Sequence, residues 1–255
     1  MAGGKGSRLN PLTLVASKQL LPIFDKPLIY YPLSTLMLAN IKQIAIVAMP
    51  SQIPRFQELL GTGSNLGIEL TYLAQEHPGG IAQSLLIAEK YLSGSKCVLI
   101  LGDNIFHGPG LGRRLEMFSG VVGGKIFGYT VKNAEPYGIA TLGDLGEVKK
   151  LEEKPINSQS NIAIPGIYFL DEFAAQKAST LQPSLRGELE ILDLLEIYRE
   201  NEALELEMLP RGTAWFDTGT FNDMHEASTY VRLMQERTGE RVGDPFQIAK
   251  FQTWI

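Results

Sequence analysis

A cluster of small and cationic residues near the start of the chain could bind phosphate groups. The glycines Gly3, Gly4 and Gly6 lie within four positions, and Arg8 and Lys18 follow them. Glycine has no Cβ, so consecutive backbone N–H groups can approach a ligand closely and form an anion-binding concavity. Arginine offers phosphate oxygens a planar fork of donors, and lysine offers a compact positive charge. The stretch predicts either a cradle for a polyphosphate or a glycine-rich turn with solvated charges.

Two common glycine motifs are excluded at this position. A P-loop requires Gly-x-x-x-x-Gly-Lys followed by Ser or Thr, whereas Gly6 follows Lys5 here. A dinucleotide-binding fingerprint requires a third glycine where this chain has Leu9. The glycine stretch therefore belongs to neither of these nucleotide-binding motifs.

Acidic residues next to turns could hold a metal ion. The apolar run 97–101 predicts a buried strand, and Asp103 follows it closely. Ligands of doubly wound sheets bind outside the carboxyl ends of the strands. A carboxylate there, beside a phosphate cradle, suits Mg²⁺, although a helix-capping or turn aspartate fits the position equally. Asp217 stands in a similar turn-rich stretch, 215–220.

Other candidates lie further along the chain. Lys154 and Arg186 join Arg8 and Lys18 as cations near glycines or turns, where each could bind phosphate or simply be solvated. The pair Gly79-Gly80 separates a predicted strand from a predicted helix. A ligand can meet a helix N-terminus at such a point, but an ordinary turn is the alternative.

Composition limits the classes of function. The chain has 255 residues, 44% of them hydrophobic, and a net charge of −5, so no global field attracts nucleic acid or an anionic membrane. A single cysteine, Cys97, excludes a disulfide framework and a Cys-rich metal site, and is typical of a reducing compartment. We expect neither a spanning helix nor a signal peptide, and therefore a cytoplasmic protein.

Alternating helices and strands must position these residues. Helices are predicted over 27–39, 54–60 and 81–91, and strands over 41–49, 68–73 and 97–101. This alternation predicts an α/β fold with a doubly wound, mostly parallel sheet. From residue 123 shorter strands appear at 125–131, 139–142, 146–151 and 204–209, with helices over 171–179, 188–202 and 223–240. We expect one domain, 1–255, with halves at about 1–122 and 123–222 and a C-terminal helical segment, 223–255.

The motifs taken together resemble the sugar nucleotidyltransferase family, in particular its glucose-1-phosphate thymidylyltransferases. The resemblance covers essentially the whole chain and rests on the segments 1–9, 17–23, 25–27, 30–37, 101–106, 151–155, 186–191 and 215–220. It implies a Rossmann-like nucleotidyltransferase fold with an embedded sugar-binding lobe. It also implies a reaction, in which dTTP and α-D-glucose 1-phosphate give dTDP-glucose and pyrophosphate with the help of Mg²⁺. Members of the family commonly form homotetramers.

The resemblance also implies roles for individual residues. Catalytic roles fall on Arg8, Lys18, Asp103, Lys154 and Asp217, with Asp103 and Asp217 as the Mg²⁺ ligands. Nucleotide-binding roles fall on Gly3, Gly4, Gly6, Ser7, Arg8, Gln19, Gln75, Gly80 and Asp103. Contacts to the sugar phosphate fall on Asn104, Tyr137, Gly138, Glu153, Lys154, Gly166 and Arg186.

Some features depart from the family pattern. Its members have a short apolar strand before the glycine loop and a helical tail beyond Ile255, and Pro165 stands where a threonine is common. We expect loss of that strand to unsettle the glycine loop. Two alternatives stay open: a UTP- or ATP-using glucose-1-phosphate pyrophosphorylase, and a non-catalytic relative that binds nucleotide sugars.

Overall fold

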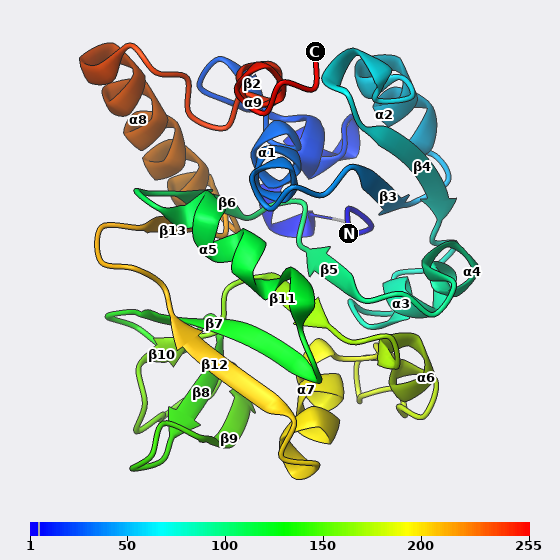
Figure 1. Ribbon diagram of the computed structural model, residues 1–255, viewed down its shortest axis with the longest axis vertical. Helices are drawn as coiled ribbons and strands as arrows, with labels where there is room; N and C mark the ends of the chain where they lie inside the picture. The colour runs from blue at the N-terminus through cyan, green and yellow to red at the C-terminus, as the bar shows by residue number, and fades with distance from the viewer. Residues whose placement is uncertain (5) are drawn as a thin grey trace. The chain divides into compact units, whose positions relative to one another are not determined.

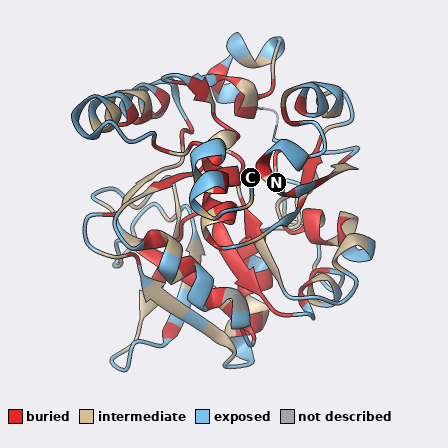
Figure 2. Ribbon diagram, turned by 45° about the horizontal axis from the view of Figure 1, so that its top comes forward, coloured by how far each residue is buried: buried red, intermediate tan, exposed pale blue. Residues whose placement is uncertain are grey.

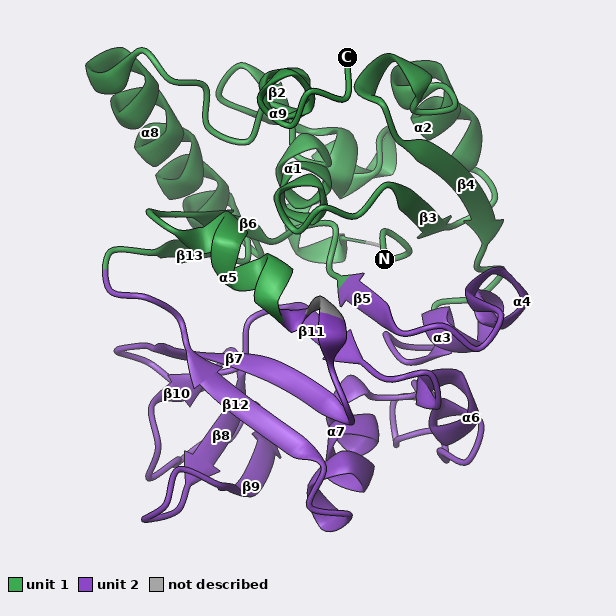
Figure 3. Ribbon diagram, viewed as in Figure 1, with its two compact units in different colours: residues 1–78, 100–117, 212–255 green, residues 79–99, 118–211 purple. Residues whose placement is uncertain are grey.

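A computed structural model describes residues 1–4 and 6–255, except for the side chain of residue 119, and shows an α/β protein (Figure 1). The chain forms two compact units, which we describe separately (Figure 3). The first unit contains residues 1–78, 100–117 and 212–255, and the second contains 79–99 and 118–211. Among the described residues, no helix combines the length and the apolar character that crossing a membrane requires.

A parallel βαβ element forms part of the first unit. Strand β3 (Gln43–Ala48) pairs in parallel with β4 (Glu69–Ala74), and α2 (Ile53–Leu60) with the 3₁₀ turn η4 (Ser64–Leu66) connects them. The apolar run in β3 is largely buried, as expected for a strand covered on both faces. The predicted strands at 41–49 and 68–73 and the helix at 54–60 are confirmed.

Helix α1 (Tyr30–Leu38) is buried over most of its circumference. Every residue from Tyr31 to Met37 is buried, which agrees with its almost uniformly apolar sequence. The helix stops before Asn40, whose φ of 60° lies in the left-handed region that asparagine tolerates. Helices α5 (Leu111–Met117) and α9 (Pro245–Phe251) contact α1 within the same unit.

One hydrophobic cluster anchors the segment that follows the glycine loop. Leu9 is fully buried and packs with apolar residues of helix α8 (Phe221–Thr238) (buried residues are red in Figure 2). The cluster consists of Leu9, Leu21, Ile23, Leu28, Tyr31, Ile105, Met224, Ala227, Val231 and Val242. Leu9 belongs to the 3₁₀ turn η1 (Ser7–Leu9), and Ile23 belongs to β1 (Pro22–Ile23), which forms a hairpin with β2 (Lys26–Pro27). The 3₁₀ turns η2 (Leu12–Leu14) and η3 (Lys18–Leu20) lie between η1 and β1.

A two-stranded pairing in the first unit was not expected from the sequence. Strand β6 (Ile105–His107) pairs antiparallel with β13 (Ala214–Phe216). The stretch 215–220, predicted as a loop, therefore begins as a strand. Its turn residues lie just beyond β13, where the capping box of Thr220 and Asp223 starts α8.

The second unit is built around a mixed sheet. Among the described residues its strand order is β5-β11-β7-β10-β8-β9, with β12 also paired to β7. The strands are β5 (Cys97–Ile100), β7 (Gly124–Thr130), β8 (Gly138–Leu142), β9 (Val148–Glu153), β10 (Ile162–Ala163), β11 (Ile167–Leu170) and β12 (Leu204–Met208). Its helices are α3 (Gln83–Ile87), α4 (Glu89–Leu92), the 3₁₀ turn η5 (Phe118–Gly120), α6 (Ala174–Ala178) and α7 (Ile191–Glu200).

Strand direction is the main difference from expectation. The α/β class is confirmed, but parallel pairing is described for β3 with β4 and for β12 with β7, whereas β7, β8, β9, β10 and β11 pair antiparallel with one another. Short connections allow hairpins, and hairpins are antiparallel, whereas parallel neighbours need a longer crossover. The helix predicted over 81–91 is also divided in two at Ala88.

Candidate active site

The glycine loop of the first unit begins at a hydrogen-bonded segment. Met1 donates its terminal N–H to the carbonyl of Ile100 (2.9 Å) and accepts from Gly102 N (2.8 Å), while Ala2 N donates to Val47 O (2.7 Å). Met1 and Ala2 are thus held between β3 and the segment 100–102, at the end of β5. The loop then passes through Gly6, with φ of 61°, into η1. The described residues of the loop thus run from a fixed segment through a glycine turn into a helical turn, and anion binding there stays a prediction.

Gly3 is the point of closest approach in this loop. A Cβ on Gly3 would lie 2.0 Å from Oε1 of Gln75, so any larger residue would require the buried Gln75 side chain to move. Gln75 is fully buried just beyond β4, where its N–H donates to Ala48 O (2.8 Å). Gly4 differs, because nothing lies within 4 Å of its corresponding position. The structure therefore brings the predicted base-recognition glutamine against the predicted phosphate loop.

Lys18 and two aspartates meet in the same unit. The Nζ of Lys18, which is 7% exposed, donates to Asp103 Oδ2 (2.7 Å) and to the carbonyl of Asp217 (3.3 Å). Thr218 is fully buried and donates its hydroxyl to Asp103 O (2.8 Å). The amine of Lys18 thus joins its own segment to two others that are distant in sequence, those of Asp103 and Asp217.

Backbone strain accompanies this convergence. Thr218 has φ of 44°, an uncommon conformation for a β-branched residue, and such conformations cost about 1–3 kcal/mol. The surrounding contacts hold the residue there, and its hydroxyl reaches Asp103 as a result. The sequence alone suggested no role for Thr218, although Thr218 lies within the segment 215–220 that carries the family resemblance.

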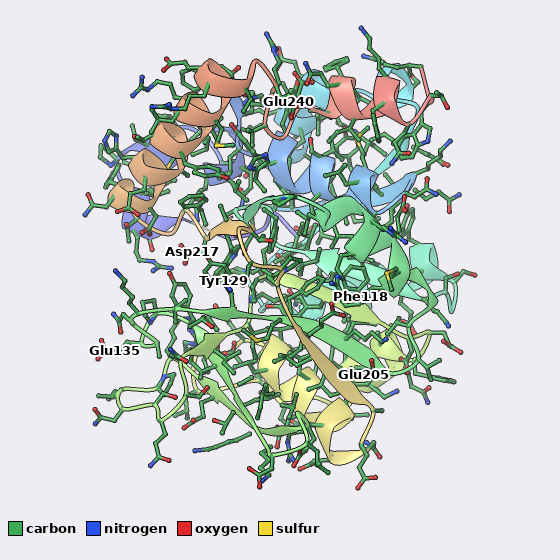
Figure 4. All side chains as sticks on the ribbon, turned by 60° about the vertical axis from the view of Figure 1, so that its left-hand side comes forward. Phe118, Tyr129, Glu135, Glu205, Asp217 and Glu240 are labelled. Atoms are coloured by element: carbon green, nitrogen blue, oxygen red, sulfur yellow. The ribbon has the colours of Figure 1, made fainter. Side chains whose placement is uncertain are left out.

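The environment of Asp217 disfavours its charge. Burial raises the pKa of this carboxyl, and the negative charge of Asp223 and, to a smaller degree, that of Asp103 raise the pKa further. A hydrogen bond from Gly219 N (3.3 Å) and the charge of Lys18 act in the opposite direction. Asp217 lies on the loop that follows β13 (Figure 4). Carboxylates that repel one another in this way suit a bound cation.

Of the remaining predicted nucleotide contacts, Ser7, Arg8 and Gln19 lie in the first unit and Gly80 lies in the second. Arg8 is exposed, and its Nη1 lies 3.6 Å from the position that a Cβ on Gly219 would take. Ser7 is exposed on η1, whereas Gln19 is 4% exposed and accepts a hydrogen bond from Ser17 Oγ (2.5 Å). Gly80 belongs to the second unit, where its φ is 94° and a Cβ would lie 2.3 Å from Leu189 O.

The second unit brings together the other predicted cations. Lys154 Nζ lies 2.7 Å from Glu153 Oε1, and Arg186 Nη2 lies 3.6 Å from the same oxygen. Arg186 also pairs with Glu190 (3.0 Å), a residue for which the sequence alone suggested no role. Glu190 accepts a further hydrogen bond from Ser184 Oγ (2.7 Å). Two partly exposed cations and two carboxylates thus form one network.

Backbone pairing places Tyr137 and Gly138, two of the predicted sugar contacts, near this network. Gly138 and Glu153 are partners in the β8–β9 pair, and Lys154 N donates to Tyr137 O (3.0 Å). Gly166 is buried directly before β11. Asn104 is the exception, because it belongs to the first unit, where its side chain bonds to Trp215 and Asp103.

Comparisons with known proteins identify the family of this chain. A family profile described as "Nucleotidyl transferase" matches residues 1–232. A glucose-1-phosphate thymidylyltransferase of Mycobacterium tuberculosis is 45% identical over 255 residues, which is all of this chain and 88% of that protein. The enzyme of the same name from Mycolicibacterium smegmatis is 48% identical over 249 residues, or 98% of this chain and 86% of that protein.

Solved structures give the same result. A Bacillus anthracis protein provisionally described as a glucose-1-phosphate thymidylyltransferase superposes with a TM-score of 0.85 at 32% identity, covering 96% of each chain. A UDP-glucose pyrophosphorylase shares the fold, with a TM-score of 0.81 at 23% identity over 91% of this chain and 97% of that one. The chain therefore belongs to the nucleotidyl transferase family and, within it, to the glucose-1-phosphate thymidylyltransferases.

Proposed function

We propose that this chain transfers a thymidylyl group from dTTP to α-D-glucose 1-phosphate and releases pyrophosphate. The observation that carries the proposal is the convergence of Lys18, Asp103 and Asp217 in the unit that contains the glycine loop. This arrangement supplies the positive charge and the metal-binding oxygens that transfer between phosphates requires. Family membership adds independent support.

The proposed reaction is a single in-line displacement. A phosphate oxygen of glucose 1-phosphate attacks the α-phosphorus of dTTP and forms a new P–O bond. The bond from the α-phosphorus to the bridging oxygen breaks, and pyrophosphate leaves with that electron pair. The protein forms no covalent bond, so its contribution is to position the reactants and to neutralise charge.

We assign nucleotide binding to the first unit. The N–H groups of Gly3, Gly4 and Gly6 and the guanidinium of Arg8 would bind the β- and γ-phosphates. Lys18 would stabilise charge on the α-phosphate, because its amine is held at the two acidic segments. The buried amide of Gln75 would hydrogen-bond a pyrimidine edge, which offers both donors and acceptors.

The acidic pair suits Mg²⁺. Asp103 and Asp217 offer carboxylate oxygens, the donors that Mg²⁺ prefers, and burial together with neighbouring acids raises the pKa of Asp217. Among the described residues no group of three or more acidic, histidine or cysteine side chains is placed to hold a metal, so phosphate oxygens of the nucleotide would complete the coordination. When bound, Mg²⁺ would neutralise charge on the phosphate oxygens.

We assign the sugar phosphate to cations of the second unit. Lys154 and Arg186 would bind its phosphate, and Glu153 would accept hydrogen bonds from sugar hydroxyls. In the described structure both cations are already paired with carboxylates. The dianionic phosphate must therefore compete with Glu153 and Glu190 for them. Tyr137, Gly138, Gly166 and Asn104 remain proposed sugar contacts, and assembly into a cytoplasmic tetramer remains part of the proposal.

Competition between nucleotides tests the proposal. Pyrophosphate release should be measured with dTTP, UTP and ATP in turn, each with glucose 1-phosphate and Mg²⁺. We expect dTTP to give the highest kcat/KM. A clear preference for UTP or ATP would mean that the chain is a glucose-1-phosphate pyrophosphorylase with a different nucleotide specificity. Nucleotide binding without release of pyrophosphate would mean that it is a non-catalytic relative.

A further inference from the structure

A side-chain relay leads from an indole to the Asp103 carboxylate. The Nε1–H of Trp215 donates to Asn104 Oδ1 at 2.7 Å, and Asn104 Nδ2 donates to Asp103 Oδ1 at 3.0 Å. Asn104 is 2% exposed, so water does not readily replace either hydrogen bond. The relay lies entirely within the first unit.

The β6–β13 pair explains why these residues meet. Trp215 is the register partner of Phe106, and Asn104 immediately precedes β6. The pairing carries the indole to the chain segment that supplies Asp103. The relay is therefore built into strand pairing and does not depend on a mobile side chain at the surface.

The chemistry of the indole sets the direction of the relay. Indole N–H is a donor only, so it requires an acceptor and turns the Oδ1 of Asn104 toward itself. The NH₂ group of the amide must then point at Asp103 and donate to the carboxylate. If the amide reversed, its oxygen would face the carboxylate oxygen and the two would repel.

The other polar groups of Asp103 are held separately. Lys18 Nζ binds Oδ2 at 2.7 Å, and the hydroxyl of Thr218 binds the main-chain carbonyl at 2.8 Å. Asn104 is therefore the described partner of Oδ1. Without a fixed amide, the carboxylate could rotate about its remaining contact with Lys18.

We propose that Trp215 is a positioning residue that acts through Asn104 to orient the Asp103 carboxylate toward the divalent cation of the bound nucleotide. This inference rests on the proposed function, because it takes Asp103 as a metal ligand. Partners that orient a ligand in this way typically change metal affinity by about 10–100-fold when they are replaced.

Metal binding without turnover provides the test. Free Mn²⁺ should be titrated by electron paramagnetic resonance in the presence of the protein and the α,β-methylene analogue of dTTP, with no sugar phosphate. The variants are Trp215→Phe, which keeps an aromatic ring but removes the donor, Asn104→Ala, and the double variant. Trp254→Phe is a matched control, since Trp254 is the second of the two tryptophans and its ring packs over Lys42. Thermal unfolding should show that each variant folds.

The proposal predicts a coupled loss of affinity. Each single variant should bind Mn²⁺ about 10-fold more weakly, and the double variant should be no weaker than Asn104→Ala. Trp254→Phe should match the wild type. If the losses of Mn²⁺ affinity in the two single variants multiply in the double variant, the relay is overturned. It is also overturned if Trp215→Phe binds Mn²⁺ as the wild type does and shows only a raised KM for glucose 1-phosphate.

The outcome separates this inference from the proposed function. If the wild type binds Mn²⁺ with the analogue but forms no dTDP-glucose, the transfer reaction is wrong, while a coupled loss would still support the relay. If the wild type forms dTDP-glucose and Trp215→Phe binds Mn²⁺ normally, only the relay is wrong. If the wild type binds no Mn²⁺ with the analogue, both are overturned.

Discussion

Lys18 and Asp103 form a close ion pair whose lysine is almost completely buried: Nζ lies 2.7 Å from Oδ2, with the two side chains 8% and 29% exposed. The two residues are 85 positions apart in sequence. A buried ammonium needs its partner, because removal of one member leaves an uncompensated charge. The pair therefore links folding of the first unit to the chemistry that we propose for it.

Loss of the Lys18 charge should affect catalysis strongly. Lys18→Met keeps much of the side-chain volume but removes the amine that reaches both acidic segments. We expect kcat to fall by at least about 100-fold, a typical cost of removing one group that stabilises charge in a transition state. Lys150→Met is the control, because Lys150 is 64% exposed and pairs only with Glu152 in the described structure. Steady-state assays of pyrophosphate release would measure both, and equal kcat values would contradict the role of Lys18.

The two aspartates should respond in opposite ways to conversion into asparagine. Asp103→Asn leaves the buried Lys18 without its charged partner, so we expect the free energy of unfolding to fall by about 1–3 kcal/mol. Asp217→Asn removes a charge that burial and Asp223 disfavour, so we expect unchanged stability or a gain of up to about 1 kcal/mol. Both variants should lose Mg²⁺-dependent turnover. Urea unfolding checks the stabilities, and a strongly destabilised Asp217→Asn would refute this account of its environment.

Gly3 and Gly4 provide a matched pair for testing the loop. A Cβ at Gly3 meets Gln75 at 2.0 Å, whereas a Cβ at Gly4 meets nothing within 4 Å. Gly3→Ala should lower the free energy of unfolding by about 1–3 kcal/mol, as overpacking does, and Gly4→Ala should change it by much less. In the background of Gln75→Ala, the added cost of Gly3→Ala should largely disappear. Equal costs in both backgrounds would show that Gln75 is not the obstacle.

His107 should make stability depend on pH. Burial lowers the pKa of this imidazole, with a smaller opposing effect of Glu240, and Nδ1 lies 2.7 Å from the hydroxyl of Tyr230. Because the folded pKa is below the unfolded value, protonation favours the unfolded chain. Stability is thus retained above the ordinary histidine pKa of about 6.5 and falls as the pH decreases below it.

Urea unfolding between about pH 7.5 and 5.5 would measure this effect. His107→Asn should flatten the pH dependence of the free energy of unfolding. His77→Asn serves as the control, since His77 is exposed. Identical slopes in the wild type and His107→Asn would contradict the assignment.

Local pattern predicted much of the fold. The apolar run from Leu28 onward predicted a buried helix, which is α1, and the apolar run over 44–49 predicted a buried strand, which is β3. Both predictions succeeded because each depends on residues that are neighbours in sequence. The mixed sheet could not be predicted, since strand direction depends on which distant segments pair. The β6–β13 pair was missed for the same reason, because strands of three residues carry little periodicity.

The site illustrates the same limit. The residue types of Lys18, Asp103 and Asp217 suggested phosphate and metal chemistry, but only family resemblance suggested that they act together. Their convergence depends on contacts between segments that no local spacing encodes. Trp215 and Glu190 gave no separate signal, because their roles depend on partners that only the fold supplies.

The fate of the α-phosphate tests the central claim most directly. The wild-type chain should be incubated with dTTP labelled at the α-phosphorus, glucose 1-phosphate and Mg²⁺, and the products separated. We predict that the amount of label found in dTDP-glucose equals the amount of pyrophosphate released. No label should be attached to the protein, and no transfer should occur without glucose 1-phosphate. Label that stays in dTTP, or appears in dTMP independently of glucose 1-phosphate, would contradict the proposed transfer.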